Sequence, residues 1–179
     1  MTTTAHYYLS RLKRPTIGET NNNKKQQYTM KHNNKQTAEF FVLGKAAKGS
    51  NFETDGTTAT SYTTAIAERT NNGILIAANY RACSYYGTFY GRTATTERQK
   101  LHIKRACNKY GLNWYEVPNP FATSRKEHEN NWQYLQMQGR DMQEKANRAR
   151  SFERATAYNY TACRLLAEAE RYWIDFVEA

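Results

Sequence analysis

The sequence predicts an α+β protein: a mostly antiparallel sheet of about five strands with one packed helix, followed by a long C-terminal helix or helical hairpin. Three observations predict this class. Short segments with alternating apolar residues before residue 122 indicate strands. A capped basic segment among them has the spacing of a helix, and a proline-free stripe of small or apolar residues runs from Trp132 to Phe176.

The N-terminal region predicts two strands separated by a basic loop. Residues 5–13 alternate loosely and carry two tyrosines, as a strand does. Residues 14–36 are rich in Asn, Gln and Lys, so we expect a flexible loop, or an arm that becomes ordered on a polyanion. The last part of this loop carries Lys24, Lys25, Lys31 and Lys35 without an acidic residue. Residues 37–45, TAEFFVLGK, then predict a buried strand.

The middle of the chain predicts a β-hairpin and two further strands. Residues 60–69 alternate as a half-buried strand does, and Asn72-Gly73 form a tight turn into the partner strand, ILIAANY. Residues 85–90 predict another short strand, in which glycine permits a turn. Residues 112–117, LNWYEV, predict the last strand of the sheet.

A basic helix is predicted from near Thr95 to a left-handed cap at Gly111. One outward stripe follows the spacing i, i+4, i+7, i+11 and consists of Arg98, His102, Arg105 and Lys109. Lys100 and Lys104 flank this stripe, and Thr96, Ile103, Ala106, Cys107 and Tyr110 lie opposite, toward the expected core. A helix with one apolar and one basic side suits phosphate binding, and the alternative is a solvated basic face.

The C-terminal helical region begins at Thr123 or Ser124, where Glu127 completes a capping box. Gly139 is the weak point, because glycine costs about 1 kcal/mol relative to alanine in a helix. If the chain bends there, some 40 residues of helix remain, roughly 60 Å at 1.5 Å per residue. We therefore divide the chain into a basic α+β domain, residues 1–122, and a helical region, residues 123–179, packed on it or self-associating.

The charge distribution predicts a polyanion as partner. The net charge is +10, and from Arg125 onward nine basic residues balance nine acidic ones, so the excess lies in residues 1–122. Such a localised excess is typical of proteins that bind a phosphate backbone, and tyrosines can stack on bases, although an acidic protein surface would attract the same patch. The predicted nucleic-acid-binding residues are Arg92, Arg98, Lys100, His102, Lys104, Arg105, Lys109, Tyr86, Tyr90, Lys24, Lys25, Lys31 and Lys35.

The sequence predicts neither a metal site nor a cofactor. Cys83, Cys107 and Cys163 are widely spaced and the four histidines are scattered, which favours reduced thiols over a zinc site. No apolar run approaches the ~20 residues that a transmembrane helix needs. Because the N-terminus also lacks the apolar stretch of a signal peptide, we expect a cytoplasmic protein that does not enter a membrane.

The segments GIL at Gly73–Leu75 and FYG at Phe89–Gly91 are followed by an arginine and a histidine on the next predicted helix. In this arrangement they resemble the GIY-YIG nucleases. The resemblance implies metal-dependent cleavage of a phosphodiester, with Tyr90, Arg98, His102 and Glu127 as the catalytic residues, or with Glu129 in place of Glu127. Leu75 stands where the family has its first tyrosine, and no defining pattern surrounds the glutamate.

A second block comprises Asn51-Phe52, SYTTAIA at 61–67, NNGILIA at 71–77 and RTATTERQ at 92–99. It resembles small proteins of bacteriophages and other mobile elements. Arg92 stands where tyrosine is usual in that block, and Gln99 where histidine is usual. The resemblance implies a phage or mobile-element origin and no reaction.

Charge and resemblance together predict a non-enzymatic protein of the bacterial host cytoplasm. It would bind nucleic acid, with RNA favoured, or a host ribonucleoprotein effector, and would inhibit host defence in the manner of an anti-CRISPR protein. A metal-dependent nuclease of the GIY-YIG type is one alternative. A helical protein-interaction module is another, in which the C-terminal helix would also form a homodimer.

Overall fold

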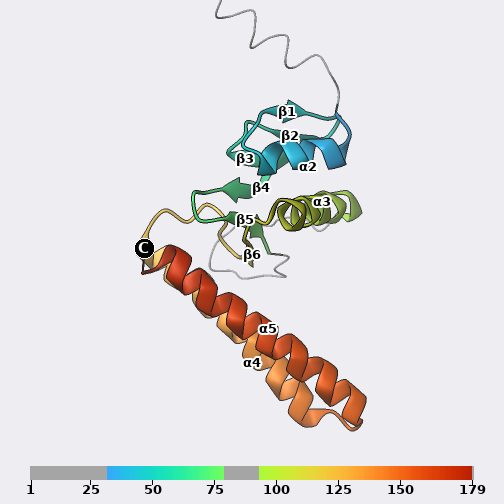
Figure 1. Cartoon of the computed structure of the whole chain (residues 1–179), viewed down its shortest axis with the longest axis vertical. Coiled ribbons are helices and arrows are strands. Elements are labelled where there is room, and N and C mark those ends of the chain that lie inside the picture. Colours follow the sequence, from blue (N-terminus) through green and yellow to red (C-terminus); the bar gives the residue numbers. More distant parts are fainter. Residues whose placement is uncertain (1–31, 79–92, 179) are drawn as a thin grey trace, which may run out of the picture. The chain divides into compact units, whose positions relative to one another are not determined.

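The computed structural model describes residues 32–78 and 93–178. Its elements, labelled in Figure 1, are α2 (Asn34–Val42), β1 (Ala47–Lys48), β2 (Phe52–Thr54), β3 (Thr58–Ser61), β4 (Thr64–Arg69), β5 (Ile74–Ala77), α3 (Ala94–Tyr110), β6 (Trp114–Val117), α4 (Arg125–Arg148) and α5 (Phe152–Phe176). This confirms the α+β class. The strands predicted at residues 5–13 and 85–90 lie outside the described residues.

The sheet has six strands in the order β1-β2-β3-β4-β5-β6, antiparallel as far as β5 and parallel between β5 and β6. The predicted hairpin around Asn72-Gly73 is confirmed, since Arg69 pairs with Ile74 across the turn. The single strand predicted at residues 60–69 is wrong. A turn with Tyr62 at φ 55° separates β3 from β4, and alternation persists across so short a turn.

The segment predicted as a buried strand at residues 37–45 is wrong, because it forms most of helix α2. Asn33 and Gln36 make a capping box, in which each side chain accepts a hydrogen bond from the other residue's backbone N–H, at 2.9 and 3.1 Å. The apolar run is compatible with a helix as well as a strand, and its buried residues share one helical face. Residues 33–36 of the predicted loop thus belong to this cap and the first turn of α2, and residues 14–31 lie outside the described residues.

Helices α2 and α3 pack on one face of the sheet, where the prediction expected a single helix. Phe41 from α2 and Ile103 and Cys107 from α3 join Ile74 and Ile76 of β5 in one buried cluster. Helix α3 has the predicted extent, because it is capped by Thr93 and ends at Gly111 with φ 67°. Tyr110, which was expected to face the core, is instead 38% exposed. Gly111 supplies the left-handed conformation that ends the helix.

Helices α4 and α5 form a hairpin whose base packs on the other face of the sheet. Leu75 points away from its neighbours on β5, as alternation along a strand requires. It joins Tyr115 of β6 and Leu135 and Tyr172 of the hairpin in a second buried cluster. The predicted start at Ser124, with its capping box, is confirmed.

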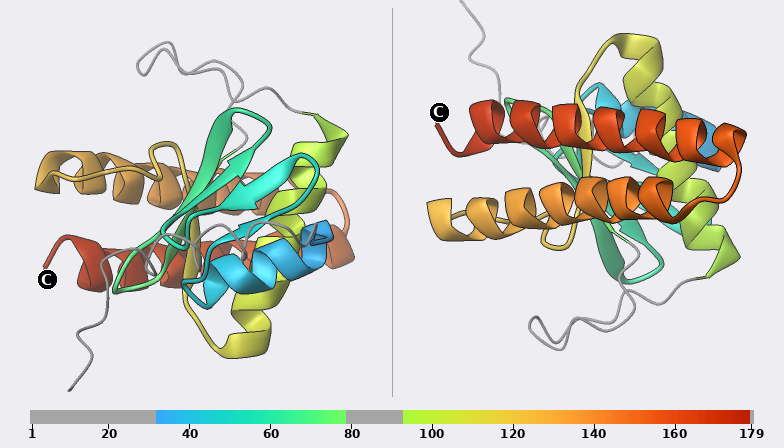
Figure 2. Two further views of the ribbon diagram at one scale, coloured as in Figure 1. Left: turned by 90° about the horizontal axis from the view of Figure 1, so that it is seen from above. Right: turned by 90° about the horizontal axis from the view of Figure 1, so that it is seen from below.

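Helix α4 continues through Gly139 to Arg148, and the chain reverses at residues 149–151. The two helices lie side by side in both views of Figure 2. Gly139 is buried, and a Cβ there would lie 2.7 Å from side-chain atoms of Leu166 on α5. Glycine therefore allows close approach of the helices and does not break α4. No helix in the described ranges is long and apolar enough to cross a membrane.

Candidate nucleic-acid interface

A basic surface is formed where the first turn of α2 lies beside the outer face of α3. We define this α2/α3 basic surface by Lys35, Arg98, His102 and Arg105. Lys35 and His102 line one shallow pocket of about 420 Å³, together with His32, Asn33, Asn34 and Ser50. The structure thus brings a lysine from the predicted loop next to the stripe predicted on the helix.

The charges of this surface are unpaired within the described part of the chain. Lys35, Arg98 and Arg105 make no side-chain hydrogen bond or ion pair with any described residue. Burial, followed by the charges of Arg105 and Lys35, lowers the pKa of His102, so its neutral form is favoured. The surface therefore presents three cations and an imidazole that can both donate and accept a hydrogen bond.

Lys109 and Lys104, which also belong to the predicted set, make ion pairs with glutamates. The Lys109 ammonium lies 3.1 Å from Glu39 Oε1 and so links α3 to α2. Hydrogen bonding to Tyr110 and then to Glu39 raises the pKa of Lys109. The Lys104 ammonium lies 2.8 Å from Glu116 Oε2 and 5.1 Å from the centre of the Trp114 ring. The ion pairs of both lysines therefore link α3 to neighbouring elements of the fold, α2 and β6.

Lys100, which the sequence placed between the two faces of α3, has a side chain that the fold covers. Its side chain is only 2% exposed, and the ammonium lies 3.5 Å from Glu97 Oε1. Burial lowers the pKa of Lys100, while Glu97 opposes this shift. Lys100 lies between the outward stripe and the core-facing residues of α3, and a long side chain there is easily covered. The other predicted residues, Arg92, Tyr86, Tyr90, Lys24, Lys25 and Lys31, lie outside the described residues.

The residues of the nuclease alternative have different surroundings. Arg98 and His102 lie one turn apart on α3, whereas Tyr90 is outside the described residues. Glu127 Oε2 accepts hydrogen bonds from the backbone N–H groups of Thr123 and Ser124, both at 3.0 Å, and these lower its pKa to about 2. Glu127 thus caps α4. Within residues 32–78 and 93–178, no group of three or more His, Cys, Asp or Glu side chains could hold a metal ion.

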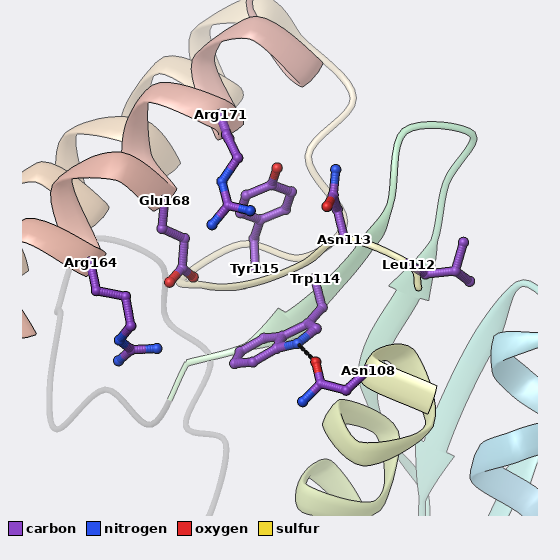
Figure 3. Close-up of a pocket in the computed structure, with 8 residues that line it drawn as sticks. All are labelled: Asn108, Leu112, Asn113, Trp114, Tyr115, Arg164, Glu168 and Arg171. Atoms are coloured by element: carbon purple, nitrogen blue, oxygen red, sulfur yellow. Dashed lines mark hydrogen bonds between the residues drawn. The ribbon is translucent and has the colours of Figure 1, made fainter. Parts of the chain in front are cut away.

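A second pocket, which the sequence did not predict, lies between α5 and β6 (Figure 3). We call it the α5/β6 pocket; its volume is about 220 Å³. It is lined by Asn108, Leu112, Asn113, Trp114, Tyr115, Arg164, Glu168 and Arg171. The spacing i, i+4, i+7 of the three charged residues on α5 was a signal in the sequence, but it also fits the solvated flank of a long helix.

Comparisons with protein-family models, with curated proteins and with solved structures found no match for this chain. The function is therefore inferred from the residues of the α2/α3 basic surface and of the α5/β6 pocket. The α2/α3 basic surface is the one whose chemistry agrees with the excess of positive charge in the sequence.

Proposed function

We propose that this protein binds nucleic acid, with RNA favoured, through the α2/α3 basic surface and without catalysing a reaction. The observation that carries the proposal is that Lys35 of α2 lies close to His102 and Arg105 of α3. Arg98 precedes His102 by one turn on the same helix, and none of the three cations has an acidic partner among the described residues. Unpaired cations held together on a folded surface attract phosphate groups and release their counterions on binding.

The surface is preorganised for such binding. Phe41 of α2 and Ile103 of α3 are fully buried in one cluster, and the ion pair between Lys109 and Glu39 joins the two helices. The backbone positions that carry the three cations are therefore set before a ligand arrives. Preorganisation lowers the entropy that binding must overcome.

RNA is favoured over DNA because His102 adds a hydrogen-bonding group among the cations. A neutral imidazole can bond to a ribose 2′-hydroxyl, which DNA lacks. A compact surface of this kind also suits an unpaired strand, whose phosphates and bases can adapt to it.

The proposed biological setting follows from the resemblance in residues 50–112. We propose a phage or mobile-element protein in the cytoplasm of a bacterial host. It would bind the RNA of a host ribonucleoprotein effector and inhibit host defence, as anti-CRISPR proteins do. The SYTTAIA and RTATTERQ segments support this setting, and so does the excess of positive charge in residues 1–122.

A second candidate function is a helical protein-interaction module. It is favoured by the hairpin of α4 and α5, on which Phe152 is 85% exposed and Tyr160 is 74% exposed. Large apolar side chains exposed in this way are common at protein interfaces. A homodimer through this hairpin would be detected by light scattering and would be lost in a Phe152→Ser, Tyr160→Ser variant.

The nucleic-acid proposal is tested with labelled single-stranded RNA and DNA of the same sequence, titrated at several salt concentrations with and without Mg²⁺. The test variant carries Lys35→Gln, Arg98→Gln and Arg105→Gln. The control variant carries Lys126→Gln, Arg150→Gln and Arg154→Gln, which removes the same charges from exposed positions on the helical hairpin.

We expect the wild-type protein to bind RNA with an affinity that falls as salt rises. The slope of log K against log salt changes by about 0.7 for each contact with a single-stranded phosphate, so the test variant should lower it by roughly 2. Equal slopes for the test and control variants would refute the α2/α3 basic surface. Cleavage that needs Mg²⁺ and is abolished by Arg98→Ala would instead support the nuclease alternative.

A further inference from the structure

The α5/β6 pocket contains a glutamate whose side chain is mostly covered and whose carboxylate makes no hydrogen bond with the described residues. Glu168 is 8% exposed and makes no hydrogen bond or ion pair with the described residues. Figure 3 shows its carboxylate extending from α5 toward Trp114. Burial raises its pKa, and the charges of Arg164 and Arg171 oppose this shift. Because its oxygens reach the pocket and bond to no described residue, this carboxylate is a candidate for ligand binding.

Two arginines flank this carboxylate without pairing to it. Arg164 and Arg171 precede and follow Glu168 by about one turn, and both are exposed. Neither guanidinium lies within ion-pair distance of a described carboxylate. Their donors are therefore available to an anionic group at the mouth of the pocket.

The rest of the pocket combines an aromatic ring with amides. The Trp114 indole N–H donates to Asn108 Oδ1 at 2.9 Å, which fixes the ring next to the end of α3. The amide N–H of Asn113 reaches Asp175 Oδ2 only at 3.4 Å, so this amide is weakly held. A volume of about 220 Å³ is below the ~300 Å³ at which drug-sized pockets begin, so it suits a group no larger than one base.

We propose that the α5/β6 pocket binds one unpaired guanine of the RNA. The Glu168 carboxylate accepts hydrogen bonds from guanine N1–H and N2–H, the base contacts Trp114, and Arg164 and Arg171 bind the adjoining phosphates. This inference rests on the proposed function, since it names the base that the bound RNA would present.

Guanine is the base whose hydrogen-bonding edge matches a carboxylate. Its N1–H and N2–H groups are adjacent and parallel, so both oxygens of Glu168 can accept at once. Adenine and cytosine each offer a single exocyclic amino group there, and uracil offers one N–H. Recognition of unpaired bases through this edge, together with stacking on an aromatic ring, is usual in proteins that bind single-stranded RNA.

The pocket adjoins the α2/α3 basic surface through helix α3. Asn108, which lines the pocket, follows Arg105 by three residues, and residues at this spacing are neighbours on a helix surface. One strand of RNA can therefore contact Arg105 through a phosphate and place a nearby base in the pocket.

The test compares an all-uridine oligonucleotide with one that has a single guanosine at its centre. A bidentate contact to one base contributes about 1–3 kcal/mol, so we expect the second to bind wild-type protein roughly 5- to 150-fold more tightly. Glu168→Gln should abolish this preference, because a glutamine has one acceptor oxygen. The matched control is Glu170→Gln, at an exposed position on the same helix. This variant should keep the preference for the oligonucleotide that contains guanosine. Arg171→Gln should weaken binding of both oligonucleotides.

A second measurement does not depend on RNA binding. Guanosine 5′-monophosphate is titrated while the indole N–H resonance of Trp114 is followed by NMR, with adenosine 5′-monophosphate as the comparison. A shift with the guanine nucleotide alone, lost in Glu168→Gln, supports the pocket even if no RNA binds and the proposed function fails. Equal binding of both oligonucleotides by wild-type protein, or no shift with either nucleotide, would overturn the inference and leave salt-dependent RNA binding intact.

Discussion

Because Gly139 packs closely against Leu166, we predict that Gly139→Ala destabilises the wild-type protein but stabilises a Leu166→Ala variant. In Gly139→Ala, the new Cβ would lie 2.7 Å from both Cγ and Cδ2 of Leu166. Overpacking of this kind costs about 1–3 kcal/mol, whereas alanine gains about 1 kcal/mol over glycine in a helix. We therefore expect Gly139→Ala to lower the free energy of unfolding by about 0–2 kcal/mol.

The same substitution in a Leu166→Ala background should raise the free energy of unfolding by up to about 1 kcal/mol, because only the helix preference remains. Urea unfolding of the four proteins in this cycle measures the coupling, which we expect to be about 1–3 kcal/mol. Gln143→Ala, at an exposed position of α4, is the control and should have the same effect in both backgrounds. Stabilisation by Gly139→Ala in the wild-type background would refute the packing argument.

Two further predictions concern titration and thiol chemistry. The pKa of Glu127 is lowered to about 2 in the folded state, so its stabilisation is present above the unfolded value of about 4.3 and is lost as pH falls toward 2. Thermal melts between pH 5 and pH 2 should therefore lose less stability in Glu127→Gln than in wild type; equal losses would contradict this role. Cys107 is buried and its thiol pKa is raised to about 12, whereas Cys163 is exposed. Iodoacetamide should therefore modify Cys163 before Cys107, as peptide mass spectrometry would show; faster labelling of Cys107 would contradict the packing of α3.

The elements that the sequence predicted well have strong local signals. Helix α3 and the start of α4 carry their own caps, Thr93, Gly111 and Ser124, and a cap depends on a few neighbouring residues. The hairpin at Asn72-Gly73 is likewise local. The errors arose where the local signal was ambiguous. The apolar run of α2 fits two periods, and β1 and β2 have only two and three residues.

The sequence predicted only part of the candidate site, because local spacing again gave a signal only within one helix. Helical spacing placed Arg98, His102 and Arg105 on one face of α3, and the structure has this arrangement. Spacing could not show that Lys35 lies beside them, because this depends on the packing of α2 against α3. Nor could it show that Lys100 is covered.

By itself, the sequence determined the fold class, the basic helix and its outward stripe, because periodicity, caps and turn residues act over a few positions. The tertiary structure decided which charges are available. It gave Lys109 and Lys104 glutamate partners from other elements, Glu39 and Glu116. It also buried Glu168 between two arginines beside a strand more than forty residues earlier in the chain. Burial and pairing depend on contacts between distant segments, so they follow from the packing of the whole chain.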